Sequence, residues 1–271
     1  GVFLGDGCCK EKLLTLSSET EEIPNEIARL INGIAQKNSD KNYNWTFAFK
    51  NSFVVEKNGR EYTRTKFHTN EFFEKFQDEL CGYAHEKRIP KEYFYGSIEQ
   101  RLNLIQGLMD TDGSICQNDE NRFNMRYTSN SLLLIQDFQQ LLYGLGYKST
   151  ISEDNRTDKY TNGICYTLNI LIPNEDKYLF FRLKRKKDIA IKAKEFHKRK
   201  DYSKIAIISI EKEKIQREMT CIYVDNEEHL YLTNDYIVTH NTTTARFIIS
   251  ALAQIGGFDP QIDVCFATFT G

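Results

Sequence analysis

Hydrophobic and polar positions follow two different periods along residues 1–200. In some segments apolar residues recur three and four positions apart, which predicts helices, and in others they alternate with polar residues, which predicts strands. The predicted helices cover 23–36, 70–82, 97–112, 133–145 and 175–186. The predicted strands cover 10–16, 45–49, 53–67, 123–127, 149–152 and 165–172, with a turn signal at Asn58-Gly59. The pattern predicts an α+β protein.

The order of these elements occurs twice. It follows Asp6-Gly7 and recurs after Asp112-Gly113, at an offset of 106 residues. A duplicated unit usually folds as two similar halves about a pseudo-twofold axis. Two unrelated α+β stretches with the same order are the alternative.

The segment that opens each repeat carries the clearest chemical signal. Ser97 and Gln100 form a capping box at the start of a helix that contains Gly107. A glycine inside a helix costs about 1 kcal/mol relative to alanine, which is explained where a second helix approaches closely. If that second helix is 1–7, Asp6 and Asp112 emerge together at two helix C-termini, where carboxylates require a cation. Paired carboxylates with Mg²⁺ serve phosphodiester hydrolysis. A helix end with a solvated aspartate is the alternative.

The segments 1–7 and 107–113 resemble the two signature motifs of the LAGLIDADG (dodecapeptide, DOD-type) homing endonucleases. The resemblance implies two αββαββα-type repeats with pseudo-twofold symmetry, whose antiparallel strands lie in the major groove of double-stranded DNA. It also implies that Asp6 and Asp112 bind the catalytic metal, Mg²⁺. Only the last seven residues of the first motif are present, so we expect the first repeat to be truncated.

Lys87 lies in Lys87-Arg88-Ile89-Pro90, ahead of the second motif. This segment is similar to the Lys-x-Ile-Pro segment of intein-borne members of the family. The resemblance makes Lys87 a candidate for stabilising the developing phosphate charge. A surface lysine is the alternative.

The charge of the chain is unevenly distributed. The formal net charge is −2, from 36 Lys+Arg and 38 Asp+Glu, but residues 181–204 carry 11 basic and 3 acidic residues, a local charge of +8. The remainder carries −10. A basic segment suits contact with a phosphate backbone, although a solvated helix face has the same composition. The 40% of hydrophobic residues exclude a disordered chain.

The seven cysteines form no C-x-x-C pair, and no apolar stretch is long enough to span a bilayer. Both observations predict a cytoplasmic protein with reduced thiols and no membrane partner.

Short strand-like runs fill 205–241 and end in Thr239-His240-Asn241-Thr242. The Asn241 amide can attack its own carbonyl, forming a succinimide and breaking the chain before Thr242. His240 would polarise that carbonyl or protonate the leaving amine, and His229 could help to activate the asparagine. The Thr242 hydroxyl can act as a nucleophile toward an upstream acyl group.

This region resembles the C-terminal splicing segment of inteins, the small all-β C-terminal part of the Hint fold. By that resemblance, Asn241 is the terminal intein residue, and Cys221 supports the junction chemistry or is a small core thiol. An intein also needs an N-terminal nucleophile, usually Cys or Ser, with its own Hint half, and residues 1–20 contain no such region. We therefore expect the partners to be an upstream N-terminal intein half and a host extein in the same precursor. Residues 242–271 would be C-extein, similar to the start of a P-loop DNA helicase or related ATPase.

The sequence therefore predicts an intein fragment with an embedded homing endonuclease that makes metal-dependent double-strand breaks in the intein-less allele. The predicted segments are the truncated repeat 1–96, the second repeat 97–204, the splicing segment 205–241 and the extein 242–271. One alternative is a decayed, inactive DNA-binding relic retained with the splicing element. Another is a LAGLIDADG-type intron maturase or regulator, which leaves 239–242 unexplained.

Overall fold

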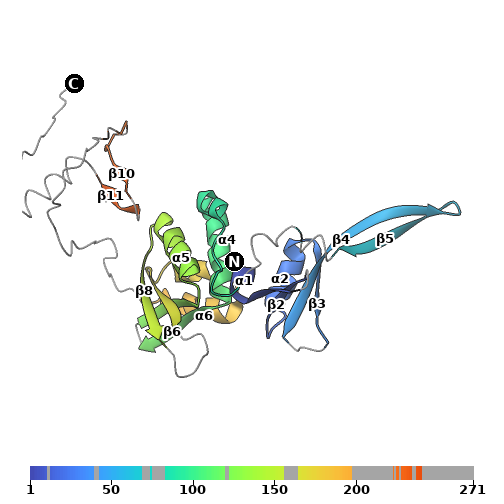
Figure 1. The fold of residues 1–271 in the computed structure, drawn as a ribbon, viewed down its shortest axis with the longest axis horizontal. Helices are drawn as coiled ribbons and strands as arrows, with labels where there is room; N and C mark the ends of the chain where they lie inside the picture. Colours follow the sequence, from blue (N-terminus) through green and yellow to red (C-terminus); the bar gives the residue numbers. More distant parts are fainter. Residues whose placement is uncertain are drawn as a thin grey trace, which may run out of the picture. The chain divides into compact units, whose positions relative to one another are not determined.

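The computed structural model describes residues 1–10, 13–39, 43–68, 74, 83–119, 122–155, 164–196, 222, 224–225, 227–233 and 236–239. The chain divides into two compact units, Gly1–Lys204 and Ile205–Gly271 (Figure 1). The helix predicted over 70–82 lies, apart from Glu74, outside the described residues, and so do Cys221, His240, Asn241 and the predicted extein.

The first half of the larger unit contains a five-stranded antiparallel sheet. Four of its strands have the order β1-β2-β4-β3, and β5 pairs with the far end of β4. The elements are α1 (Val2–Asp6), β1 (Gly7–Lys10), β2 (Leu13–Ser17), α2 (Glu22–Leu30), β3 (Gly33–Lys37), β4 (Asn44–Lys57) and β5 (Arg60–His68).

The second half repeats this arrangement. Its four antiparallel strands have the order β6-β7-β9-β8, the same connectivity as β1-β2-β4-β3. The elements are η1 (Lys91–Tyr95), α4 (Ile98–Asp110), β6 (Gly113–Asp119), β7 (Arg122–Ser129), α5 (Leu132–Gly144), β8 (Lys148–Asn155), β9 (Ile164–Leu171), η2 (Lys177–Phe180) and α6 (Lys184–Ala193). The predicted α+β class and the duplicated order of elements are confirmed.

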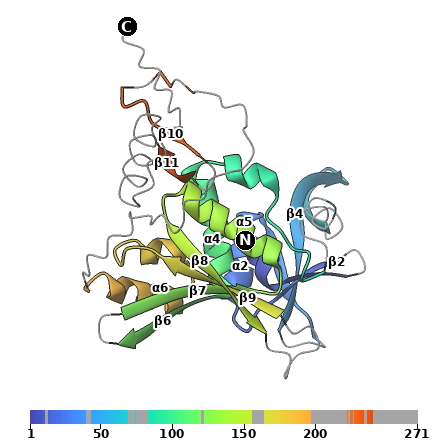
Figure 2. The ribbon, with the colours of Figure 1, turned by 60° about the vertical axis from the view of Figure 1, so that its left-hand side comes forward.

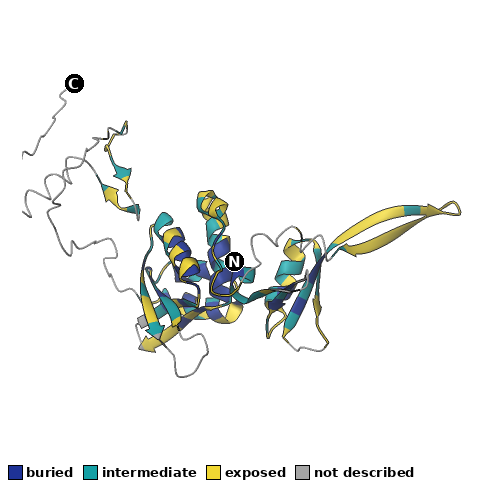
Figure 3. Cartoon of the chain, viewed as in Figure 1, coloured by how far each residue is buried: buried dark blue, intermediate teal, exposed yellow. Residues whose placement is uncertain are grey.

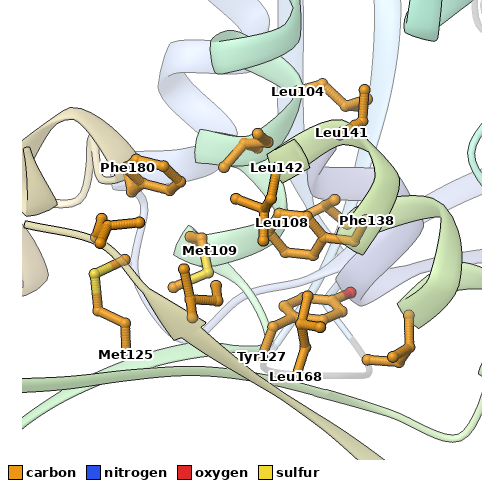
Figure 4. Close-up of a cluster of buried hydrophobic side chains, with 14 of the residues drawn as sticks. Leu104, Leu108, Met109, Met125, Tyr127, Phe138, Leu141, Leu142, Leu168 and Phe180 are labelled. Atoms are coloured by element: carbon orange, nitrogen blue, oxygen red, sulfur yellow. The ribbon is translucent and has the colours of Figure 1, made fainter. Parts of the chain in front are cut away.

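Each half buries one face of its sheet. In the second half α4 and α5 cover that face (Figure 2), and the core between them includes Leu108, Met109, Tyr127 and Phe138 (Figure 4). The smaller core of the first half contains Leu14, Leu16, Trp45 and Phe47. Alternate residues of β7 are buried, as the period of two requires. Figure 3 shows the buried residues of the chain in dark blue.

Two predictions for the first half are wrong. The single strand expected over 10–16 belongs to two strands, β1 and β2, that pair with each other. The helix expected over 23–36 ends at Leu30, because Asn32 adopts a positive φ of 50° and β3 begins at Gly33. Ile34 consequently lies on β3, opposite Ala48, and not on the apolar face of a helix.

The two strands expected over 45–49 and 53–67 are arranged differently. β4 runs unbroken to Lys57, and the chain reverses at Asn58-Gly59, where both residues have positive φ. The turn signal is therefore confirmed, although the expected break near residue 50 does not occur.

In the second half the helix expected over 175–186 is replaced by η2 and α6. Between them, the backbone N–H groups of Arg182 and Leu183 donate to the Asp110 carboxylate at 3.0–3.2 Å, which holds the chain out of a helix. The capping box at Ser97 and Gln100 is present, which confirms the start of α4.

In the smaller unit β10 (Tyr231–Leu232) pairs antiparallel with β11 (Val238–Thr239). Among the described helices, none combines the length and apolarity that crossing a lipid bilayer requires.

Candidate functional site

Helices α1 and α4 pack backbone to backbone at Gly1 and Gly107. A Cβ atom on Gly107 would lie 2.6 Å from the Val2 nitrogen and 2.9 Å from the Gly1 Cα. Neither neighbour is a flexible side chain, so any larger residue would push the helices apart. The close approach expected from Gly107 is confirmed.

This packing brings Asp6 and Asp112 to adjacent helix ends. Asp6 is the last residue of α1, and Asp112 follows the end of α4 by two residues. An Asp112 carboxylate oxygen would lie 3.2 Å from a Cβ atom on Gly5, so the side chain reaches across to α1.

Burial disfavours the charged form of both carboxylates. Burial raises the pKa of Asp6 above its usual range. Burial and then the charge of Asp6 raise the pKa of Asp112 to about 6, although part of that side chain remains exposed to solvent. Two nearby carboxylates whose charged forms are disfavoured are suited to share a divalent cation.

The donor set fits a cation of the Mg²⁺ type. In the ranges the structure describes, no group of three or more His, Cys, Asp or Glu side chains could hold a metal. Two carboxylates with the remaining positions left to water or substrate oxygens match the way Mg²⁺ is usually bound, whereas a structural zinc site would need more protein ligands.

Lys87 lies beside the end of α1, where Asp6 is located. Its Nζ donates to the backbone carbonyls of Gly5 at 2.8 Å and Gly7 at 3.1 Å, on either side of Asp6. Burial lowers the pKa of Lys87, and the charges of Asp112 and Asp6 oppose that shift. The structure thus brings Lys87 to the carboxylates, and its catalytic role stays a prediction.

A second lysine, which the sequence reasoning did not single out, occupies the matching position in the other half. Lys186 is only 7% exposed, and its Nζ donates to the carbonyls of Met109, Asp110, Thr111 and Gly113 at 2.6–3.1 Å. Thr111 and Gly113 are the counterparts of Gly5 and Gly7 at the 106-residue offset. Burial and the neighbouring charge of Arg185 lower the pKa of Lys186 to about 8.

The segment that carries Lys87 is held by the second half. The Ser131 hydroxyl donates to the Lys87 carbonyl at 2.5 Å, and the buried Ile89 N–H donates to the Asp137 carboxylate at 2.9 Å. Arg88 lies 3.4 Å from the same carboxylate. Helix α5 therefore fixes the backbone from which Lys87 reaches α1.

Tyr127 places a buried hydroxyl near the carboxylates. Its Oη has no hydrogen-bond partner among the described residues, and the side chain is 0% exposed. Burial, followed by the charges of Asp112 and Asp6, raises the pKa of Tyr127 well above its usual value.

The open face of the second sheet is polar. Between the buried residues of β7 lie Arg126 and Thr128, opposite Asn169 and Thr167 on β9. Thr128 and Thr167 are within 3.5 Å of each other through their hydroxyls, and Asn169 donates to Ser152 at 3.3 Å. This face offers hydroxyl, amide and guanidinium groups to a polar partner.

The basic segment 181–204 is described as far as residue 196. Lys184 and Arg185 are exposed on α6, whereas Lys186 is buried beneath α4. The segment is therefore not a uniformly solvated helix face.

Of the predicted splicing residues, the structure describes only His229. Its Nδ1 lies 2.8 Å from the Val224 carbonyl, and the residue has a positive φ of 50°. His240, Asn241 and Thr242 lie outside the described residues, so the splicing site stays a prediction.

Residues 99–183 match the family model described as a LAGLIDADG-like domain. This range runs from the first turn of α4 to the start of α6, so the match covers the second half of the larger unit.

The replicative DNA helicase DnaB of Mycobacterium intracellulare is 30% identical over 179 residues, which cover 60% of this chain and 27% of the helicase. The chain thus spans about a quarter of that relative's length. Among solved structures, mesophilic variants of the homing endonuclease I-DmoI give a TM-score of 0.37 at 15% identity, covering 66% of this chain and 82% of theirs. The homing endonuclease I-WcaI bound to its DNA recognition sequence gives 0.37 at 15% identity, covering 70% and 81%.

Proposed function

We propose that the Gly1–Lys204 unit is a LAGLIDADG-type homing endonuclease that hydrolyses both strands of duplex DNA with Mg²⁺. The observation that carries this proposal is the pair Asp6 and Asp112, placed at adjacent helix ends and shifted in pKa by burial, with the charge of Asp6 adding to the shift of Asp112. A structural role does not explain two partly buried carboxylates at helix C-termini, where the helix dipoles disfavour them.

Asp6 and Asp112 would hold the cation, which when bound polarises the scissile phosphate and activates water. Lys87 and Lys186 fix the backbone carbonyls beside each aspartate and place two positive charges next to the pair. Those charges would stabilise negative charge that develops on the phosphate. The polar open face of the second sheet would bind the bases, since the major groove admits a two-stranded ribbon.

The test is cutting of a plasmid that carries the uninterrupted host gene, by the full-length precursor in Mg²⁺. We expect Asp112→Asn to abolish cutting and leave duplex binding intact. Asp188→Asn, an exposed acidic residue on α6, is the matched control and should cut normally. Unchanged cutting by Asp112→Asn would remove this residue from the metal site. Binding without cutting by the unaltered protein would favour the decayed relic.

A second function, protein splicing, is favoured by Thr239-His240-Asn241-Thr242, which begins at the last residue of β11. The helicase match gives independent support. It covers 60% of the chain, whereas residues 205–271 make up about a quarter of it, so the match extends into the endonuclease-like unit. A helicase that contains such a segment is the expected host of an intein of this kind. Because the seven cysteines are odd in number and form no C-x-x-C pair, we place the process in the reducing cytoplasm.

Intact-mass measurement of the precursor tests the splicing proposal. We expect a ligated host and an excised segment ending at Asn241, and Asn241→Ala should abolish release of the C-terminal part. Asn234→Ala, which removes a nearby asparagine, should splice normally. Persistent release by Asn241→Ala would refute the assignment.

A further inference from the structure

The β4–β5 hairpin continues past the point at which its counterpart in the second half stops. In the second half β9 ends at Leu171, opposite Lys148 at the start of β8. In the first half the equivalent pairing joins Phe49 to Gly33 at the start of β3, but β4 runs on to Lys57 and returns as β5. We call residues 50–67 the arm; it extends beyond the shared four-stranded sheet (Figure 1).

The arm has no core of its own. All of its residues are exposed except Val55, which is half-buried (Figure 3). Its large apolar side chains include Phe53 at 40%, Val54 at 61% and Tyr62 at 49% exposure. An isolated two-stranded hairpin is only marginally stable in water, so an arm of this length is explained best by a partner that covers it.

The register gives the arm two different faces. Residues directly opposite each other in an antiparallel pair point to the same side. One face consists of the pairs Asn51–Lys66, Phe53–Arg64, Val55–Tyr62 and Lys57–Arg60, and we call it the basic face. The other consists of the pairs Lys50–Phe67, Ser52–Thr65, Val54–Thr63 and Glu56–Glu61.

Charge separates the two faces. The basic face carries four cations and no acidic residue, whereas the opposite face carries one lysine and two glutamates. In the described part of the chain, no salt bridge joins any of the four cations to a carboxylate. The Lys66 ammonium lies 5.5 Å from the centre of the Phe53 ring, so a cation and an aromatic ring lie next to each other on this face.

The size of the arm suits a DNA groove. Eight residues of extended strand span about 27 Å. At about 3.4 Å of helix axis per base pair, this length covers about eight base pairs. The major groove accepts a two-stranded ribbon, and a cationic face within it neutralises the flanking phosphates.

We propose that the basic face of the arm binds duplex DNA. Because side chains alternate along β4, this face continues the side of the strand that carries Trp45 and Phe47, so the contact lies on the side of the core and is separate from the open face of the sheet. This inference rests on the proposed endonuclease function. Because the second half has no counterpart of the arm among its described residues, the contact with DNA is asymmetric.

Two variants of the full chain test the inference. The first, K57Q/R60Q/R64Q/K66Q, neutralises the basic face. The second, E56K/K57E/R60E/E61R/R64T/T65R, exchanges three neighbouring pairs of residues, so it moves three cations to the opposite face without changing composition or net charge. S52Q/T63Q/T65Q is the matched control on the opposite face. Unfolding followed by Trp45 fluorescence checks that each variant is folded.

The measurement is fluorescence anisotropy with a labelled mixed-sequence duplex of 40 base pairs between 50 and 200 mM NaCl. Each phosphate contact contributes about 0.9 to the slope of log affinity against log salt concentration. We expect both the neutralised and the exchanged variants to have slopes less steep by about 2 to 4, and the control to match the unaltered chain.

Each outcome has a distinct meaning. Unaltered binding by the neutralised variant would overturn the arm inference and leave the endonuclease proposal standing. A loss in the neutralised variant alone would show that net charge, not the basic face, matters, and would also overturn the inference. Absence of duplex binding by the unaltered chain would overturn both proposals. Arm-dependent binding to phosphatidylserine vesicles in place of duplex would overturn the inference in favour of a membrane partner.

Discussion

Replacement of Lys186 by methionine tests the claim that this lysine holds the end of α4. The last carbonyls of a helix have no partner within the helix, and the Lys186 ammonium donates to four carbonyls at this helix end. Methionine keeps the apolar stem and removes the donor. Each buried acceptor left unsatisfied costs about 1–3 kcal/mol. Partial relaxation reduces the total, so we expect Lys186→Met to lower the free energy of unfolding by about 2–4 kcal/mol.

The lowered pKa of Lys186 reduces the expected loss of stability in Lys186→Met but does not cancel it. A pKa of about 8 means that burial disfavours the charged amine relative to the neutral one. Both forms of lysine can donate hydrogen bonds, whereas methionine donates none. The lost hydrogen bonds should therefore outweigh the relief of burying a charge.

Urea unfolding followed by the fluorescence of Trp45 measures the effect. Trp45 is the single tryptophan of the chain and is 4% exposed, so its emission reports on the fold of the larger unit. Lys184→Met is the matched control, because it removes the same charge from an exposed position on the same helix. We expect this control to change stability by less than about 0.5 kcal/mol.

The pH dependence gives a second readout. Lys186 has a pKa of about 8 in the folded state, below the value of about 10.4 of an unfolded lysine. Between these values the unfolded state binds more protons, so the contribution of Lys186 raises stability as pH increases through this window. Lys186→Met should lack this contribution. If Lys186→Met matches Lys184→Met in both stability and pH dependence, the proposed role of Lys186 at the helix end is wrong.

Three further predictions concern the same region. Because the pKa of Asp112 is about 6, protons should compete with Mg²⁺ below that pH. We expect the affinity of the protein for Mg²⁺ to be about tenfold weaker at pH 5 than at pH 7. Calorimetric titration measures this affinity, and the same affinity at both pH values would exclude Asp112 as a ligand. Asp137→Ala leaves the buried Ile89 N–H without its acceptor and should lower the free energy of unfolding by about 1–3 kcal/mol. Asp137→Asn keeps an acceptor oxygen and should lower it by less. Equal losses for the two variants in urea unfolding would contradict this reasoning. Tyr127→Phe removes a buried hydroxyl that has no partner among the described residues and should raise stability by up to about 1 kcal/mol; a clear loss in the same assay would mean that the hydroxyl is bound.

Local signals in the sequence predicted the parts of the site that depend on neighbouring residues. The capping box fixes where α4 begins, and the misplaced glycine at 107 marks the helix crossing that brings Asp6 and Asp112 together. Both features follow from helix chemistry within a few residues, so they can be inferred without the fold.

The features that the sequence did not predict depend on contacts between distant segments. The helix expected over 175–186 is interrupted because Asp110, more than 70 residues away, accepts the Arg182 and Leu183 N–H groups. Lys186 was one of many cations in a basic segment, and only its burial beneath α4 distinguishes it. β6 carries mainly polar residues and was not predicted, since it gains its place by pairing with β7.

Because α5 binds the backbone around Lys87, the two repeats depend on each other. The first repeat provides Lys87 for its own helix end, yet the backbone of that lysine is held by Ser131 and Asp137 of the second repeat. In a chain cut after residue 96, Lys87 would lose the groups that hold its backbone, and Ser131 and Asp137 would lose the groups that they bind. We therefore expect a substitution of Ser131 or Asp137 to displace Lys87 from its place beside Asp6, although these residues lie in different halves of the sequence.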